Sequence, residues 1–310
     1  MFGKKTERIT VLILSIAMLL SSTGLVPSFA AEVSTVSSAN SVSDSTTAEI
    51  SSEGGSVTTV QVTQEGGSLA TPEGDGTASN PYTISSAEDF LNMQSIINST
   101  KSANKHFVLT TDIDLSDIKA DDFKSNSIYG GSLVSVSKSL ASSSNVGFTL
   151  DGKGHKLVGL NVESDCENAL AIFGYINASS TVSNIVVESP VITSNADSVS
   201  AVAVVAAEND GTISNVTVNN PILTASASKT AGIVAAINNG TVINCTVKGK
   251  ISNTGIATAA AHTISATGAV GAVAGYNNGK ISSVTVLNVG AFIPAEGAVV
   301  YGALAGKSCG

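Results

Sequence analysis

The 310-residue sequence contains no tryptophan and a single arginine, Arg8, and only 13% of its residues are charged. Its formal net charge at pH 7 is -9, so it lacks the basic surface that nucleic-acid binding requires. Arginine is also the residue that grips phosphates and carboxylates through two parallel hydrogen bonds. The composition therefore argues against nucleic acid as a partner and against an arginine-built phosphate site.

Cysteine and histidine are equally scarce. The three cysteines, Cys166, Cys245 and Cys309, are an odd number spread over separate segments, so they predict no disulfide framework. Cys245 replaces valine or isoleucine of the sister repeats and is interpreted as a small buried hydrophobe. No histidine has a partner at metal-ligand spacing, and no nucleophile elbow, phosphate loop or metalloprotease helix occurs. The sequence therefore predicts neither zinc nor any other cofactor.

A long apolar run occurs only near the N-terminus. Lys4, Lys5 and Arg8 precede the run 9–20, and Ser28-Phe29-Ala30 then supplies the small-x-small pattern of a signal-peptidase site. The run is shorter than the roughly 20 apolar residues that span a bilayer. We therefore predict a signal peptide over residues 1–30, cleavage before Ala31, and a secreted or cell-surface product with no membrane insertion of the mature chain.

Two segments precede the repeats. Residues 31–72 are rich in serine and threonine without a sustained period, which predicts a disordered spacer with at most one marginal strand from Ser56. Residues 73–150 are predicted to form an N-terminal cap and the first solenoid turns. Ser86 and Asp89 form a variant capping box, and apolar residues at i, i+3 and i+7 follow, predicting a helix over 87–98. We expect this amphipathic helix to cover the first open edge of the solenoid.

Residues 151–310 contain four variants of one sequence, which begin at Leu170, Val202, Ala231 and Val270, and a fifth that begins at Tyr301. The copies recur at intervals of 31, 29 and 39 residues, measured between Thr181, Thr212, Thr241 and Lys280. Such periods are typical of solenoids, whose units bury their apolar faces by stacking. We therefore predict an all-β solenoid. The fifth copy reaches Gly310 before its second strand, which we interpret as a repeat that continues further.

Three sets of equivalent residues recur in the copies. Each turn ends in a glycine expected to have a positive φ: Gly211, Gly240 and Gly279. An asparagine four residues further on is expected to form an internal hydrogen-bonded ladder: Asn184, Asn215 and Asn244. Tyr175, Tyr276 and Tyr301 are assigned to one position, interrupted by Ala207 and Ala236, where packing is favoured over sugar binding.

The module "GAVAGYNNGKISSVTV" resembles the GLUG-motif repeat of bacterial secreted and surface proteins. The segments "GDGTASNPYTISSAEDF", "FVLTTDIDLS" and "FTLDGKGHKLVGLNV" resemble, in the same order, the lead-in to those repeats. The resemblance covers about residues 74–310, with alanine for glycine at several positions and without the usual intervening aromatic stretch. It implies a right-handed parallel β-helix and brings no catalytic residues.

One acidic region is a candidate site. Asp112 and Asp114 share one face of a predicted strand, and Asp151 begins a tight turn after another strand. Carboxylates on neighbouring turns can form an acid/base pair or hold Ca²⁺. The alternative, which we favour, is that Asp112 and Asp114 solvate an outer face while Asp151 shapes its turn.

These observations favour a non-catalytic secreted or cell-surface module for adhesion or interaction, or a surface scaffold, with host or matrix proteins or glycans as candidate partners. Two alternatives remain open. One is a polysaccharide lyase or hydrolase that uses the region from Asp112 to Asp151. The other is a scaffold region of a larger surface peptidase.

Overall fold

The computed structural model describes residues 46–50, 58–62, 72–99, 104–119, 132–134, 147–165, 167, 169–196, 200–225, 230–249, 264–265, 268–288, 300–302 and 304–309. The predicted signal peptide lies outside these residues. The chain divides into two compact units, 1–68 and 69–310.

In the first unit, β1 (Thr46–Ile50) and β2 (Thr58–Val62) pair antiparallel, from Thr46 opposite Val62 to Ile50 opposite Thr58. This pair corrects the prediction for residues 31–72, which allowed one marginal strand in a disordered spacer. The second strand was missed because the apolar alternation of β1 is limited to Ala48 and Ile50, which is too short to indicate a strand.

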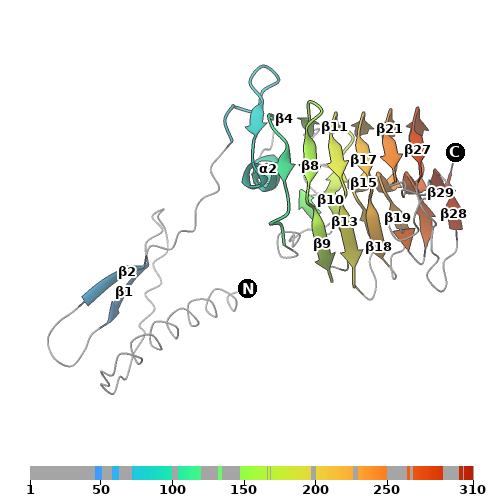
Figure 1. The fold of residues 1–310 in the computed structure, drawn as a ribbon. Coiled ribbons are helices and arrows are strands. Elements are labelled where there is room, and N and C mark those ends of the chain that lie inside the picture. The colour runs from blue at the N-terminus through green and yellow to red at the C-terminus, as the bar shows by residue number, and fades with distance from the viewer. Residues whose placement is uncertain are drawn as a thin grey trace. The chain divides into compact units, whose positions relative to one another are not determined.

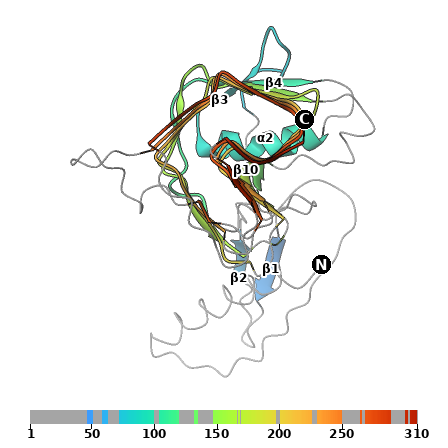
Figure 2. The same ribbon diagram turned by 90° about the vertical axis from the view of Figure 1, so that its right-hand side faces the viewer.

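The second unit is a parallel β-helix, as predicted. Its chain winds in successive coils whose equivalent strands pair in parallel and form four sheets in the described residues, named sheets I to IV here. Figure 1 shows the coils side by side from green to red, and Figure 2 shows the strands of successive coils superimposed along the stack. The coils from β7 to β25 contribute strands to all four walls, whereas the first and last described coils contribute to fewer.

Sheet I contains β3 (Tyr82–Ile84), β4 (Lys105–Leu109), β7 (Phe148–Asp151), β11 (Thr181–Ser183), β16 (Thr212–Ser214), β21 (Thr241–Ile243) and β26 (Lys280–Ser282). Sheet II contains β5 (Ile113–Asp114), β8 (Lys156–Val158), β12 (Val186–Glu188), β17 (Thr217–Asn219), β22 (Thr246–Lys248) and β27 (Thr285–Leu287). Sheet III contains β9 (Asn161–Ser164), β13 (Val191–Ser194), β18 (Ile222–Ala225) and β23 (Ile264–Ser265).

Sheet IV is built around β10 (Ala169–Ile176), whose side chains are all buried. Its first half pairs with β14 (Ala201–Ala203) and its second half with β15 (Ala206–Asn209), because each later copy bends at a buried apolar pair such as Val204-Val205. The remaining strands are β6 (Ser132–Val134), β19 (Thr230–Gly232), β20 (Ala235–Asn238), β24 (Ala269–Gly271), β25 (Ala274–Asn277), β28 (Val300–Gly302) and β29 (Ala305–Ser308).

The core fills the space inside the coils and is covered at one end by α2 (Ala87–Ser99). Phe90, Met93 and Ile97 of α2 are buried, as their spacing predicts, and the Phe90 ring lies 6.1 Å from that of Phe173 in β10. Ser86 Oγ accepts a hydrogen bond from the Asp89 amide, and the Asp89 carboxylate accepts from Ser85. The predicted capping helix is therefore confirmed.

Candidate functional site

The predicted asparagine ladder lies on the outside of the coils. Asn184, Asn215 and Asn244 have φ of 56°, 53° and 55°, and Ser283 at the equivalent position has 53°. Asparagine tolerates this left-handed conformation better than most residues. Asn215 and Asn244 are exposed. Asn215 donates to Asn184 Oδ1 over 3.1 Å, as expected of a ladder, and Asn184 donates to Asp151 Oδ1 over 2.8 Å. Because the position lies outside the coils, the prediction that this ladder is internal is wrong.

The internal ladder is formed by a different column, Asn209, Asn238 and Asn277, whose side chains are 0%, 0% and 9% exposed. Asn209 Nδ2 donates to Asn238 Oδ1 and Asn238 Nδ2 to Asn277 Oδ1, each over 2.7 Å. Sequence reasoning missed this column, although an asparagine precedes the Asp-Gly or Asn-Gly of each copy. Buried amides that satisfy one another along the stack fix the register of the coils.

The turn glycines allow close contact between coils. Gly211, Gly240 and Gly279 are not among the residues with positive φ, so that prediction is wrong. A Cβ on Gly240 would lie 2.2 Å from the Gly211 carbonyl oxygen, and a Cβ on Gly279 would lie 2.1 Å from that of Gly240. Glycine is required because the backbone of the preceding coil occupies the place of a side chain.

The tyrosine row is also shifted from the prediction. In sheet IV the strand register aligns Tyr175, Glu208, Ile237, Tyr276 and Lys307. Tyr301 instead pairs with Val270, so it belongs to another position. The expected positions Ala207 and Ala236 each lie one residue before this row, so that assignment is wrong.

Each of the three candidate carboxylates accepts at least one hydrogen bond from a backbone amide. Asp114 Oδ1 accepts from the Ser116 amide over 2.9 Å. Asp112 Oδ1 accepts from the Lys156 amide over 2.9 Å and lies 3.3 Å from His155 Nδ1. Both side chains are exposed, as the strand pattern predicts. The Asp114 contact stays within its own turn and the Asp112 contacts reach the next coil, so the two carboxylates do not converge on a shared site.

Asp151 makes contacts through both of its carboxylate oxygens. Its Oδ1 accepts from the Lys153 amide and from Asn184 Nδ2, and its Oδ2 lies 2.8 Å from Lys153 Nζ. Partial burial raises the pKa of Asp151, but the hydrogen bonds from Lys153 and Asn184 outweigh it, so the pKa is lowered. The backbone hydrogen bonds from Lys156 and Ser116 likewise lower the pKa of Asp112 and of Asp114.

Among the described residues, no group of three or more His, Cys, Asp or Glu side chains could hold a metal ion. The structure therefore gives the predicted calcium site no support. It also shows where other carboxylates point: Glu188 accepts from Asn219 over 3.0 Å and Asp210 from Asn239 over 2.8 Å, both on the following coil. Acidic side chains on the outer surface thus terminate short rows of amides.

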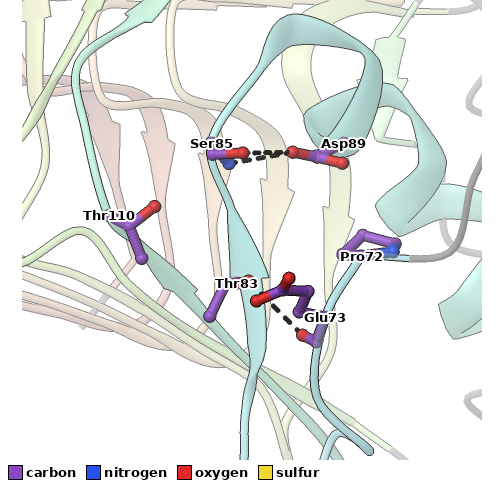
Figure 3. Close-up of a pocket in the computed structure, with 6 residues that line it drawn as sticks. All are labelled: Pro72, Glu73, Thr83, Ser85, Asp89 and Thr110. Atoms are coloured by element: carbon purple, nitrogen blue, oxygen red, sulfur yellow. Dashed lines mark hydrogen bonds between the residues drawn. The ribbon is translucent and has the colours of Figure 1, made fainter.

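One open pocket of about 370 Å³ lies beside β3 and the start of α2 (Figure 3). Its lining residues are Pro72, Glu73, Thr83, Ser85, Asp89 and Thr110. Ser85 donates to Asp89 Oδ2 through its amide and its hydroxyl, each over 2.9 Å, and the Thr83 amide donates to the Glu73 carbonyl. No histidine, lysine or cysteine lines the pocket, and its Ser85–Asp89 contacts serve the cap of α2.

The two cysteines in the described residues differ. Cys245 is 1% exposed, as predicted, and burial raises the pKa of its thiol. Cys309 is exposed, with its Sγ 3.1 Å from the Tyr276 hydroxyl. Cys166 lies outside the described residues. Among the helices that the structure describes, none is long and apolar enough to cross a membrane.

Comparison with known proteins gives three findings. No protein-family model matches the chain. A segment covering 52% of the chain is 30% identical, over 164 residues, to halomucin of Haloquadratum walsbyi (strain DSM 16790 / HBSQ001), but it spans only 2% of that protein's length. A crystal structure of a Bacteroides ovatus protein named as an immunoglobulin A1 protease aligns with 77% of this chain and 76% of its own, at 16% identity and a TM-score of 0.39.

Acidification is expected to destabilise the coils around Asp151. Because the folded state lowers the pKa of this carboxyl, its contribution is fully present above the ordinary aspartate pKa of about 3.9 and is lost as pH falls through the folded value. Asp151→Asn should therefore be less stable than the wild type near neutral pH, with the difference shrinking in acid. Urea unfolding over a pH series measures this, and a difference that stays constant would contradict it.

Proposed function

We propose that the chain is an exported, non-catalytic β-helix module that serves adhesion or interaction at the cell surface, built from GLUG-type repeats. The observation that carries this proposal is the use of polar side chains. Asn184, Asn239 and Asn219 each donate to a carboxylate of the preceding coil, and the buried amides bond to one another. The described polar groups hold coils together, which favours a rigid surface over a reaction site.

The outer carboxylates also fit a binding role better than catalysis. A general acid and base must face one reacting centre at short distance. Asp112 and Asp151 instead accept hydrogen bonds from Lys156 and Asn184 of the following coil, and Asp114 accepts one from Ser116 in its own turn. The similarity to a small part of halomucin is consistent with coils of this kind forming one segment of a much longer protein.

A long lateral surface is the feature such a module offers to partners, because a solenoid exposes the same wall over many coils. We propose host or matrix proteins or glycans as the partners. The chain's net charge of -9 disfavours polyanions such as nucleic acid.

An array of glycans and matrix proteins tests the proposal. The folded full chain should bind at least one class of immobilised ligand, and the same preparation unfolded in urea should not, because the surface depends on coil stacking. Asp114→Asn is a suitable folded control, since it alters one exposed carboxylate and no buried group. Absence of binding across the array by the folded chain would count against the proposal.

A further inference from the structure

The sequence contains two Asn-Gly dipeptides, Asn239-Gly240 and Asn278-Gly279. They occupy equivalent positions, because Asn238 and Asn277 pair between β20 and β25. The preceding copy has Asp210-Gly211 at the same place. Both asparagines are exposed, and they form a row on the outside of the coils directly beside the buried asparagine ladder. The proposed function uses the Asn239 side chain only as a contact between coils and assigns no role to either dipeptide as a reactive group.

Asparagine followed by glycine is the most reactive setting for loss of the side-chain amide, because glycine leaves its own nitrogen unhindered. The reaction requires that this backbone nitrogen reach the asparagine Cγ. In the folded chain both nitrogens are occupied: Gly240 N donates to Asn209 O over 2.9 Å and Gly279 N to Asn238 O over 3.0 Å. Reaction therefore requires local opening of the turn.

The two turns differ in how well they are held. The strand after Gly240 is β21, which pairs on one side with β16 and on the other with β26, and its central Val242 is 0% exposed. The strand after Gly279 is β26, the last of sheet I among the described residues, and its central Ile281 is only partly buried. Opening at Gly279 therefore breaks fewer contacts.

The side-chain contacts also favour reaction at Asn278 over reaction at Asn239. Asn239 Nδ2 donates to Asp210 Oδ1 over 2.8 Å and contacts Glu208 Oε1 at 3.3 Å, while its Oδ1 accepts from Asn278 Nδ2 over 3.0 Å. Conversion of Asn239 to aspartate would remove the donor between two carboxylates and add a third negative charge. Conversion of Asn278 would remove one donated hydrogen bond.

We propose that Asn278 is a site of spontaneous deamidation in the folded protein and that the stacked coil protects Asn239. The Gly279 nitrogen loses its proton to solvent base and bonds to Cγ of Asn278, and the bond from Cγ to Nδ2 breaks to release ammonia. Water then opens the five-membered imide at either carbonyl, giving aspartate or isoaspartate. The net change is addition of water and loss of ammonia, with no oxidant or other reactant.

Modification at Asn278 has two structural consequences. It adds a negative charge beside the exposed Cys309 and Tyr276 region of the final described coil. The isoaspartate product also routes the backbone through the side-chain carbon, which lengthens the main chain between β25 and β26 and shifts their register. The coil of β25 and β26 is thereby loosened while the coil of Asn239 stays closed.

Peptide mapping tests the proposal directly. The folded full chain is incubated at mildly alkaline pH, then digested with trypsin, which separates peptide 230–248 with Asn239 from peptide 251–280 with Asn278. The mass gain of deamidation and the isoaspartate content of each peptide are followed with time. Conversion at Asn278 should be about tenfold faster than at Asn239, since a difference of about 1.4 kcal/mol in local opening gives that ratio.

Two controls separate the fold from the local sequence. In urea the two sites should react at similar rates, because both have the context Asn-Asn-Gly. Asn278→Gln should abolish the fast mass gain of peptide 251–280 and leave peptide 230–248 unchanged. Equal rates at both sites in the folded chain, or reaction at neither site beyond the other asparagines of the same peptides, would overturn the proposal.

Discussion

Replacement of Asn238 by alanine is expected to lower the free energy of unfolding by about 4 kcal/mol, which would make it one of the most damaging substitutions in the coils. Asn238 is fully buried and bonded to Asn209 on one side and to Asn277 on the other. Alanine would leave the Asn277 Oδ1 without its donor and the Asn209 amide with only its longer contact, 3.4 Å, to the Thr241 carbonyl. Asn209 Oδ1 is already buried without a hydrogen-bond partner, so the column offers no other bond to replace those that Asn238 makes.

The matched control for Asn238→Ala is Asn215→Gly. Asn215 also bonds to an asparagine of the preceding coil, but it is exposed and has a φ of 53°, which glycine adopts without strain. Its loss should cost no more than about 1 kcal/mol. Urea unfolding followed by circular dichroism compares the two variants. Equal costs would show that the inner column has no special role in stability.

Gly240→Ala is the second substitution expected to have a large effect, with a loss of about 3 kcal/mol. The added Cβ would lie 2.2 Å from the Gly211 carbonyl oxygen and 2.5 Å from the Asp210 carbonyl carbon, and both are backbone atoms that cannot rotate away. The coils would have to separate, which weakens the Asn209–Asn238 bond and the outer Asn239–Asp210 bond together.

Gly154→Ala is the control for Gly240→Ala, because Gly154 requires glycine for its backbone conformation and not for close contact between coils. Gly154 has a φ of 84°, but a Cβ there meets no atom within 4 Å. Alanine should therefore lower the free energy of unfolding only by the cost of its left-handed backbone conformation, about 1 kcal/mol. If thermal unfolding showed the two glycine variants to be equally destabilised, contact between coils would not be the reason for glycine at position 240.

The periodic features of the sequence were sufficient to predict the solenoid and its cap. Intervals of about 30 residues require stacked units, and the i, i+3, i+7 spacing of Phe90, Met93 and Ile97 places one helical face against their open end. Alternation likewise placed Asp112 and Asp114 on an outer face. These properties depend on residue spacing alone.

The roles of individual turn residues could not be predicted from spacing. Aligning the copies shows that Asn209 and Asn215 each recur, but which one faces inward depends on where the chain bends, and a one-residue change reverses the side. The tyrosine row was likewise misplaced by one residue, at Ala207 and Ala236 instead of Glu208 and Ile237. The distribution of Asp112, Asp114 and Asp151 over separate turns depends on contacts between residues more than 40 positions apart, such as Asp112 with His155.

The most direct test of the central claim, that the polar side chains of these coils hold the stack and perform no chemistry, is an assay for polysaccharide cleavage. The folded wild type and an Asp112→Asn/Asp151→Asn variant are incubated with a panel of acidic polysaccharides, with and without Ca²⁺, and new reducing ends and unsaturated products are measured. Our account predicts no product from either protein and lower stability of the variant alone. Product formed by the wild type and lost in the folded variant would contradict it.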